Sequence, residues 1–185
     1  GMGWRFPDPI YRRMPLADDA HPLPASVDSL AWCTAGIQVR FRSDTSRVVL
    51  RARLRGPANM DHMPATGQCG FDLYAGDFHA ARYVATTRVA PSKTEFEVTL
   101  AQFPQRACRT LTIHFPLYQG VHGLEIGLDR EAVLKSPPAW RWRQPVVVYG
   151  TSITQGGCAA RPGMAYTNIL SRKLGCEFIN LGFSG

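Results

Sequence analysis

Hydrophobic and polar residues alternate with a period of two over much of residues 31–128. In residues 47–55, arginines alternate with four apolar side chains, those of Val48, Leu50, Ala52 and Leu54. This pattern predicts short strands with one buried and one solvated face. The predicted strands are residues 36–42, 47–55, 70–74, 79–84, 94–100, 109–115 and 123–128. Because no convincing helix interrupts them, we predict a mainly β fold that begins with a β-sandwich of jelly-roll type, residues 1–134.

The alternation also predicts which polar side chains face solvent. In two of the strands these are Gln38, Arg40 and Arg42, and Thr110, Thr112 and His114. The formal net charge of +7 comes from eighteen arginines and three lysines against fourteen acidic residues, which raises the question of a polyanionic partner. Because the arginines of the strands occupy alternate positions, without interleaved aromatic residues, we interpret them as a solvated sheet face. We therefore expect no nucleic-acid partner; the alternative would show as salt-dependent retention of generic DNA.

Residues 135–145 break the alternating pattern. They contain three prolines and two tryptophans, Trp140 and Trp142. Proline fixes φ and removes a backbone donor, so this segment is predicted to be an extended connector between two domains. Because large aromatic side chains seldom remain fully in water, we expect both tryptophans to pack against the sandwich.

The pattern changes again after the connector. Val146–Tyr149 is a continuous apolar run, typical of a strand that is buried on both faces. A helix is predicted at 165–174, with Tyr166, Ile169, Leu170 and Lys173 on one side and Gly175 ending it, and a second strand at 178–181. Residues 146–185 thus form one βαβ unit of a parallel sheet. One helix cannot cover both faces of such a sheet, so we expect the rest of an α/β domain to lie outside this chain.

Cysteine usage and the amino terminus bear on the compartment. The five cysteines are odd in number and widely spaced, and they form no C-x-x-C pair, so neither a zinc site nor a disulfide framework is indicated. Gly1 before Met2 resembles a tag remnant, and no apolar run resembles a signal sequence or approaches the ~20 residues of a membrane span. We expect a cytoplasmic protein without a membrane partner, or a secreted one if a leader was removed.

The turn after the first parallel strand, Gly150–Gly157, contains the candidate nucleophile Ser152. Active sites of open parallel sheets form at the carboxyl ends of strands, and Gly185 follows the second strand at the same edge. Other glycine-rich motifs do not match. Gly157 and Cys158 stand where a phosphate-binding loop needs Lys and Ser/Thr, no G-x-G-x-x-G occurs here, and Thr154 replaces the last glycine of G-x-S-x-G. On spacing alone, an ordinary strand-to-helix loop remains an alternative.

Several segments carry a resemblance to a known family. Residues 149–159, YGTSITQGGCA, are similar to the first sequence block of the SGNH, or GDSL-type, hydrolases, in the branch with an amino-terminal β-sandwich. Residues 160–166 and 180–185 resemble the next segments of that branch, and residues 70–74 and 116–121 resemble signatures of its sandwich. The resemblance implies that residues 146–185 begin a flavodoxin-like hydrolase domain.

The resemblance also implies roles for two residues. Ser152 would be the nucleophile and an oxyanion donor, and Gly185 a second oxyanion donor; no cofactor and no metal are required. Thr151 replaces the usual Asp, which is not the attacking group. The family's oxyanion Asn and its D-x-x-H acid and base would all follow Gly185. Asp18 with His21 fits D-x-x-H and Asn59 could be taken for the Asn, but they precede Ser152, so we interpret them as chance matches.

Other polar residues are assigned lesser roles. The histidines His62, His79, His114 and His122 have no metal-ligand spacing. Asp72 is interpreted as structural. The loop that contains Tyr118 and Gln119 is expected near the domain interface, close to Ser152.

We therefore predict the amino-terminal part of a serine esterase or acyl hydrolase that acts on a small-molecule or carbohydrate ester and is inactive without its acid and base. An acyltransferase using the same site is one alternative. A non-catalytic sandwich that binds carbohydrate or a protein partner is another, and aromatic side chains lining one sheet face would favour it. The sequence specifies no oligomeric state.

Overall fold

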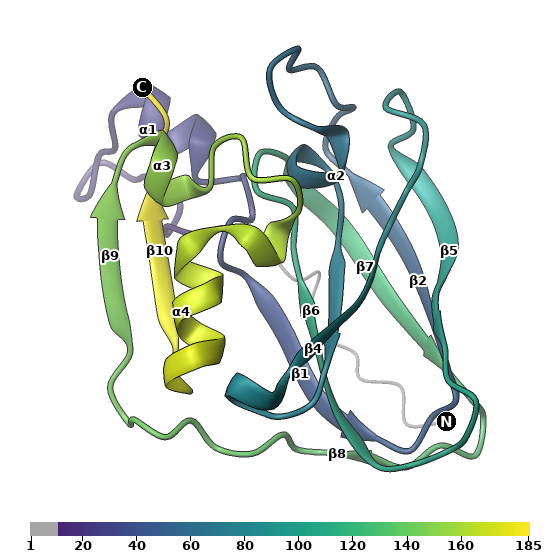
Figure 1. Cartoon of the computed structure of the whole chain (residues 1–185). Helices are drawn as coiled ribbons and strands as arrows, with labels where there is room; N and C mark the ends of the chain where they lie inside the picture. Colours follow the sequence, from purple (N-terminus) through teal and green to yellow (C-terminus); the bar gives the residue numbers. More distant parts are fainter. Residues whose placement is uncertain (1–10) are drawn as a thin grey trace.

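Strand β2 (Arg47–Leu54) shows how the alternating pattern builds the first half of the molecule. Val48, Leu50, Ala52 and Leu54 are buried, whereas Arg47, Arg51 and Arg53 are exposed. The computed structural model describes residues 11–185, and in it β2 pairs antiparallel with β5 (Glu95–Gln102) and β7 (Val121–Leu128). The buried face of this three-stranded sheet packs against a second sheet (Figure 1).

The second sheet has five strands. Their order is β4 (Arg82–Thr86), β3 (Asp72–Ala75), β6 (Arg109–His114), β1 (Gln38–Ser43) and β8 (Leu134–Lys135). The core between the two sheets includes the fully buried side chains of Leu50, Phe71, Leu73, Ile113 and Phe115. The predicted β-sandwich is therefore confirmed. Lys135, the first residue of the predicted connector, pairs with Arg42 in this sheet.

Several local predictions were wrong. The strand expected at residues 79–84 begins only at Arg82, because Phe78–Ala80 form a 3-10 turn, η1, closed by the bond from the Ala80 N–H to the Asp77 carbonyl. Two unpredicted helices, α1 (Ala25–Leu30) and α2 (Ala65–Gln68), each follow a proline. They are too short to show a helical period in the sequence.

The second half forms the predicted βαβ unit. β9 (Val146–Gly150) and β10 (Phe178–Gly182) pair in parallel, and α3 (Ser152–Gln155), the 3-10 turn η2 (Pro162–Met164) and α4 (Tyr166–Leu174) lie between them in the chain. α4 ends at Gly175, whose φ of 64° is the left-handed conformation expected after a helix. None of the helices within residues 11–185 is long and apolar enough to cross a membrane.

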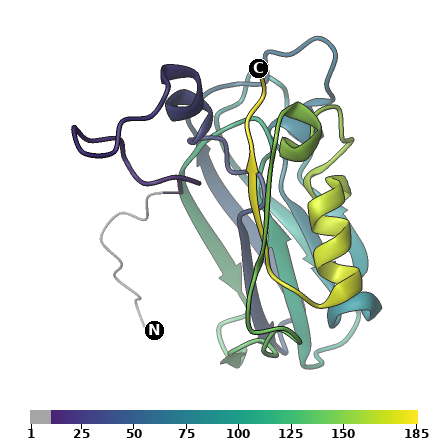
Figure 2. The same ribbon diagram turned by 90° about the vertical axis from the view of Figure 1, so that its left-hand side faces the viewer.

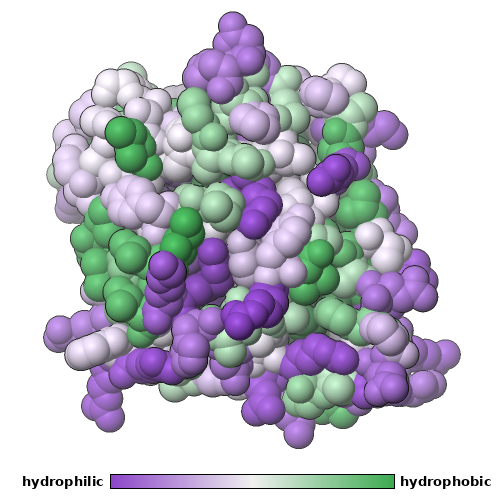
Figure 3. Space-filling model, viewed as in Figure 1, coloured by the Kyte–Doolittle hydropathy of each residue, from purple (hydrophilic) through white to green (hydrophobic). Residues whose placement is uncertain are grey.

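The expectation that β9 is buried on both faces was wrong for this chain. Val147 is 56% exposed and Tyr149 80% exposed. In the part of the chain that the structure describes, β9 pairs only with β10, so its second edge and outer face have no cover. Figure 3 shows the hydrophobic surface that gathers over this strand. The apolar sequence of β9 predicts a buried strand, but in residues 11–185 the strand lies on the surface.

Part of the outer face of the five-stranded sheet is buried, contrary to prediction. Thr110, Thr112 and His114, expected in solvent, are buried, and α4 lies next to the sandwich (Figures 1 and 2). The side of α4 that carries Tyr166 and Leu170 faces outward, and both side chains are exposed. The helix buries its other, polar side, with the side chains of Thr167, Asn168 and Ser171. A polar helix face is suited to hydrogen-bond its surroundings there.

The connector is anchored by one of its two tryptophans. The Trp140 ring lies 5.9 Å from Phe78 and 3.8 Å from the Arg40 guanidinium, which stacks over it. This confirms the packing expected of Trp140 and explains why Arg40, predicted in solvent, is half-buried. Trp142 is 64% exposed, so the same expectation was wrong for it.

Asp72 joins the two halves of the molecule. Its fully buried carboxylate accepts hydrogen bonds from Thr86 Oγ1 (2.7 Å), the Gly163 N–H (2.7 Å) and Arg161 Nη1 (3.1 Å). A Cβ at Gly163 would lie 2.4 Å from the Tyr74 ring, so only glycine allows this approach. Burial raises the pKa of Asp72, and the three hydrogen bonds oppose that rise. The structural role interpreted for Asp72 is confirmed.

Replacing Asp72 should strongly destabilise the protein. Asp72→Ala leaves the Gly163 N–H and the Arg161 guanidinium without their acceptor at a buried interface, which is expected to lower the free energy of unfolding by about 3–5 kcal/mol. Urea denaturation followed by circular dichroism measures this. Glu97→Ala, which removes an exposed carboxylate paired with Arg51, is the control and should leave the urea midpoint almost unchanged. Equal small effects of both variants would contradict the assignment.

Candidate active site

The structure brings the turn of Ser152 and the segment of Gly185 to the same edge of the parallel sheet. Ser152 is the first residue of α3, two positions after β9 ends, and Gly185 follows β10 by three residues. Because β9 and β10 are parallel, both segments leave the sheet at its carboxyl edge (Figure 1). The Phe183 N–H donates to the Gly150 carbonyl (2.9 Å), which ties them together.

Close packing and one asparagine hold these segments in place. A Cβ at Gly182 would lie 2.1 Å from the Gln155 nitrogen, so glycine lets α3 lie directly on the end of β10. Buried Asn180 donates to the Thr154 carbonyl (2.7 Å) and accepts from the Gly182 N–H (2.9 Å). The backbone on both sides of the site is therefore fixed by buried contacts.

The sandwich reaches the site through the loop after β6. Tyr118 lies here, and its hydroxyl donates to the Ser152 carbonyl (3.3 Å). Burial raises the pKa of the Tyr118 hydroxyl. The expectation that this loop lies close to Ser152 is confirmed, although the Gln119 side chain turns to the Pro57 carbonyl instead (3.1 Å).

Two further residues support the site, although the sequence pattern assigns a role to neither of them. Buried Gln155 donates to the Leu117 carbonyl (3.1 Å) and accepts from the Ser184 N–H (3.0 Å). Arg13 donates to the carbonyls of Cys33 (2.6 Å) and Gly182, and its guanidinium lies 4.5 Å from the Phe183 ring centre. Burial lowers the pKa of Arg13 to about 10. The Pro-rich start that contains Arg13 reads as irregular, so only the fold reveals its contacts.

The Ser152 hydroxyl makes no hydrogen bond within residues 11–185, and none of the five histidines bonds to Ser152. His21 is exposed and pairs with Asp18 (3.1 Å). His62 pairs with Asp61, His79 with Arg141, and His122 is exposed on β7. Asn59 accepts from Gln68 (2.7 Å) in the sandwich. The predicted chance matches, Asp18, His21 and Asn59, thus make their bonds away from Ser152.

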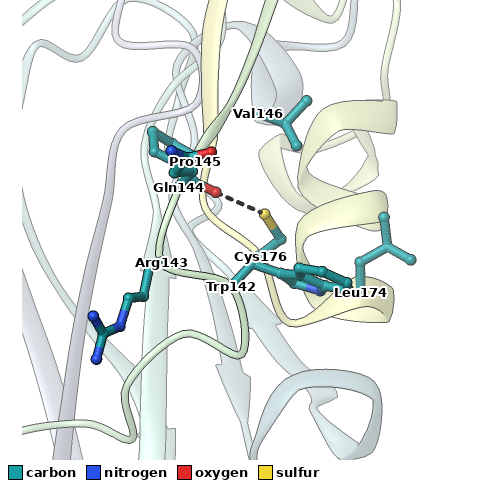
Figure 4. Close-up of a pocket in the computed structure, with 7 residues that line it drawn as sticks. All are labelled: Trp142, Arg143, Gln144, Pro145, Val146, Leu174 and Cys176. Carbon is teal, nitrogen blue, oxygen red and sulfur yellow. Dashed lines mark hydrogen bonds between the residues drawn. The ribbon is translucent and has the colours of Figure 1, made fainter.

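A hollow in the described surface lies away from Ser152. It has a volume of about 570 Å³ and is lined by Trp142, Arg143, Gln144, Pro145, Val146, Leu174 and Cys176 (Figure 4). These residues surround the start of β9 and the end of α4, whereas Ser152 follows the other end of β9, roughly 16 Å away at ~3.3 Å per residue. Among residues 11–185, no three His, Cys, Asp or Glu side chains are grouped to hold a metal ion.

Family comparison agrees with the fold and the site. A family model described as the amino terminus of SGNH-hydrolase-type esterases, named GxDLY, matches residues 1–134, and one for the GDSL-like lipase/acylhydrolase family matches residues 143–185. The chain therefore belongs to the SGNH, or GDSL-type, hydrolases that carry an amino-terminal β-sandwich. No curated protein sequence matches the chain.

Solved structures show the same two-part arrangement. A protein described as a GDSL-like lipase from Bacteroides ovatus shares 28% identity with a TM-score of 0.80, over 88% of this chain and 47% of that one. A salicylyl-acyltransferase from a tetracycline biosynthetic pathway is 18% identical with a TM-score of 0.68, over 94% and 46%. A family two carbohydrate esterase from Clostridium thermocellum is 14% identical with a TM-score of 0.53, over 82% and 46%. The last two show the fold alone. The chain spans about half the length of these proteins.

His114 lies under α4, where its Nε2 is 3.2 Å from Arg172 Nη1. Burial, with the charges of Arg172, Arg161 and Arg40, lowers the pKa of His114 to about 3. The imidazole is therefore neutral in the folded protein and protonates in the unfolded chain below its ordinary pKa of about 6.5. Because the unfolded state then binds the extra proton, His114 should reduce stability as the pH falls from about 6.5 towards 3.

Acidification should expose this effect. Between pH 7.5 and pH 5.0, the His114 contribution is expected to lower the free energy of unfolding by about 2 kcal/mol. Urea denaturation of the wild type and of His114→Gln at both pH values measures the His114 contribution as a difference between the two proteins. The variant should lose this part of the pH dependence of the free energy of unfolding. Asp72, whose pKa is raised, should instead increase the free energy of unfolding as the pH falls, and it does so equally in the wild type and in the variant. An NMR titration of His114 with a pKa near 6.5 would contradict the prediction.

Proposed function

We propose that this chain carries the nucleophile and two oxyanion donors of a serine esterase or acyl hydrolase that acts on a small-molecule or carbohydrate ester. The observation that carries the proposal is the position of Ser152. Ser152 begins α3 at the carboxyl edge of the parallel sheet, beside the segment that contains Gly185. Its hydroxyl makes no hydrogen bond within residues 11–185. Backbone N–H groups at such an edge suit a developing negative charge.

In the proposed reaction, Ser152 Oγ attacks the carbonyl carbon of the ester while a histidine takes its proton. The N–H groups of Ser152 and Gly185 hold the oxyanion of the tetrahedral intermediate. The same histidine then protonates the leaving alcohol, and water releases the acyl group from Ser152. Transfer of the acyl group to an alcohol in place of water gives the acyltransferase alternative at the same site.

We place the histidine base and its acidic partner in sequence that follows Gly185 in the whole protein. Two observations support this placement. The histidines of this chain make no hydrogen bond to Ser152, and the matching solved proteins are about twice as long. A serine hydroxyl without a base is a weak nucleophile at neutral pH.

A non-catalytic binding sandwich is the less favoured alternative. Sugar rings stack on exposed aromatic side chains, and such a sheet face would favour this function. A depression on the outer face of the three-stranded sheet is lined by five charged side chains, those of Arg51, Arg53, Glu95, Glu97 and Glu125, together with His122. Arg51 is paired there with Glu97 and Glu125. We therefore favour the enzyme.

Loss of the Ser152 hydroxyl should abolish ester hydrolysis by the protein translated from the complete reading frame. With p-nitrophenyl acetate as substrate, Ser152→Ala is expected to lower kcat at least ~10³-fold, because the acyl-enzyme can no longer form. Ser136→Ala, an exposed serine of the connector, is the control and should retain wild-type kcat. Full activity of Ser152→Ala would refute the proposed function.

The 185-residue chain by itself should not turn over p-nitrophenyl acetate above the rate of its own Ser152→Ala variant, since none of its histidines bonds to Ser152. A spectrophotometric assay at neutral pH measures the difference between the two proteins. Hydrolysis by the 185-residue chain that depends on Ser152 would show that the base lies within it and would contradict our placement.

A further inference from the structure

We propose that Gln155 is a positioning residue, through which the sandwich sets the alignment of the oxyanion donors with Ser152. This inference rests on the proposed function, because it concerns the same site. Gln155 is the last residue of α3, three positions after Ser152, and it is fully buried. It does not touch the reacting atoms and would act on them through the backbone.

The Gln155 carboxamide links three parts of the molecule. Its Nε2 donates to the Leu117 carbonyl of the sandwich, and its Oε1 accepts from the N–H of Ser184, the residue directly before Gly185. Its own backbone belongs to the helix that begins with the nucleophile. One side chain therefore joins the sandwich loop, the nucleophile turn and the segment of the second oxyanion donor.

The chemistry of both partners requires a carboxamide. The Leu117 carbonyl needs a donor and the Ser184 N–H needs an acceptor, and the Gln side chain carries one of each on a single planar group. A carboxylate of the same length would keep the acceptor and set a second oxygen against the Leu117 carbonyl. A thioether of similar length would satisfy neither partner and leave two polar groups unpaired at a buried position.

The bond to Ser184 holds the peptide directly before the second oxyanion donor. The Phe183 N–H donates to the Gly150 carbonyl, and the next N–H, that of Ser184, donates to the Gln155 side chain. Oxyanion donors must be held within about 0.5 Å of the productive position to be effective. The Gln155 acceptor therefore orients the peptide that leads to Gly185.

The other end of the link is rigid. Leu117 is fully buried, and its N–H donates to the Gly67 carbonyl (3.2 Å) in the sandwich. The next residue, Tyr118, donates to the Ser152 carbonyl. The same sandwich loop therefore holds both the nucleophile turn, through Tyr118, and the Ser184 segment, through Gln155. This gives the sandwich a part in the chemistry that does not require it to bind substrate.

The contact can be tested in the 185-residue chain without measuring activity. Amide hydrogen exchange by NMR should show a protected Ser184 N–H in the wild type. Gln155→Met should accelerate its exchange at least 10-fold, whereas Gln155→Glu, which keeps the acceptor, should retain protection. Gln68→Met is the matched control, because Gln68 is an equally buried glutamine whose side chain bonds only Asn59 and Met60, and its backbone bonds are kept in the variant. Unchanged Ser184 exchange in Gln155→Met would overturn the inference.

The effect on catalysis needs the protein translated from the complete reading frame. Gln155→Met is expected to lower kcat for p-nitrophenyl acetate by about 10–100-fold, a part of the ~10²–10³-fold typical for loss of a whole oxyanion donor, with KM within threefold. Active sites are counted by titration with a fluorophosphonate, so that a smaller folded fraction does not register as lower kcat. Gln68→Met should retain kcat and KM.

The outcomes separate this inference from the proposed function. If Ser152→Ala abolishes activity and Gln155→Met keeps full kcat per active site, only the inference fails. If Ser152→Ala is fully active, the proposed function fails, and the exchange experiment still decides whether Gln155 holds Ser184. Gln155→Asn, one methylene too short to reach both partners, replaces Gln155→Met in both experiments if that variant does not fold.

Discussion

The buried carboxylate of Asp72 is the constraint around which the two halves of the chain pack. It lies on the face of the five-stranded sheet opposite the hydrophobic core, and it binds the Gly163 N–H and Arg161 of the βαβ unit. A carboxylate removed from water requires such partners, because its charge cannot remain buried without hydrogen bonds. The close approach of Gly163 to Tyr74 follows from this bond, and it brings α4 against the sheet.

Once α4 lies on the sheet, the rest of the site takes its position. The nucleophile turn and the Ser184 segment leave the parallel strands at one edge, and the sandwich loop at 117–118 contacts both through Gln155 and Ser152. The sandwich is thus continuous with the site and forms one of its walls. The exposed β9 and the hollow beside Trp142 lie on other sides of the βαβ unit.

Much of this arrangement could be predicted from local pattern. Period-two alternation located seven of the eight sandwich strands within a few residues, the apolar runs identified β9 and β10, and the segment around Ser152 carried the family resemblance. The errors about the outer face of the five-stranded sheet have one cause. Alternation distinguishes two faces of a strand, but it does not tell whether the polar face meets water or a second domain. Thr112, His114 and Arg40 were therefore assigned to solvent.

The sequence by itself determined the elements, their order and the position of Ser152, because backbone propensity and side-chain periodicity act over a few residues. Only the tertiary structure decided which polar groups are partners. The bond between Gln155 and Leu117 joins residues 38 positions apart, and that between Asp72 and Gly163 joins residues 91 apart. Hydrogen bonds at such separations depend on how the two halves pack, and no local pattern specifies that packing.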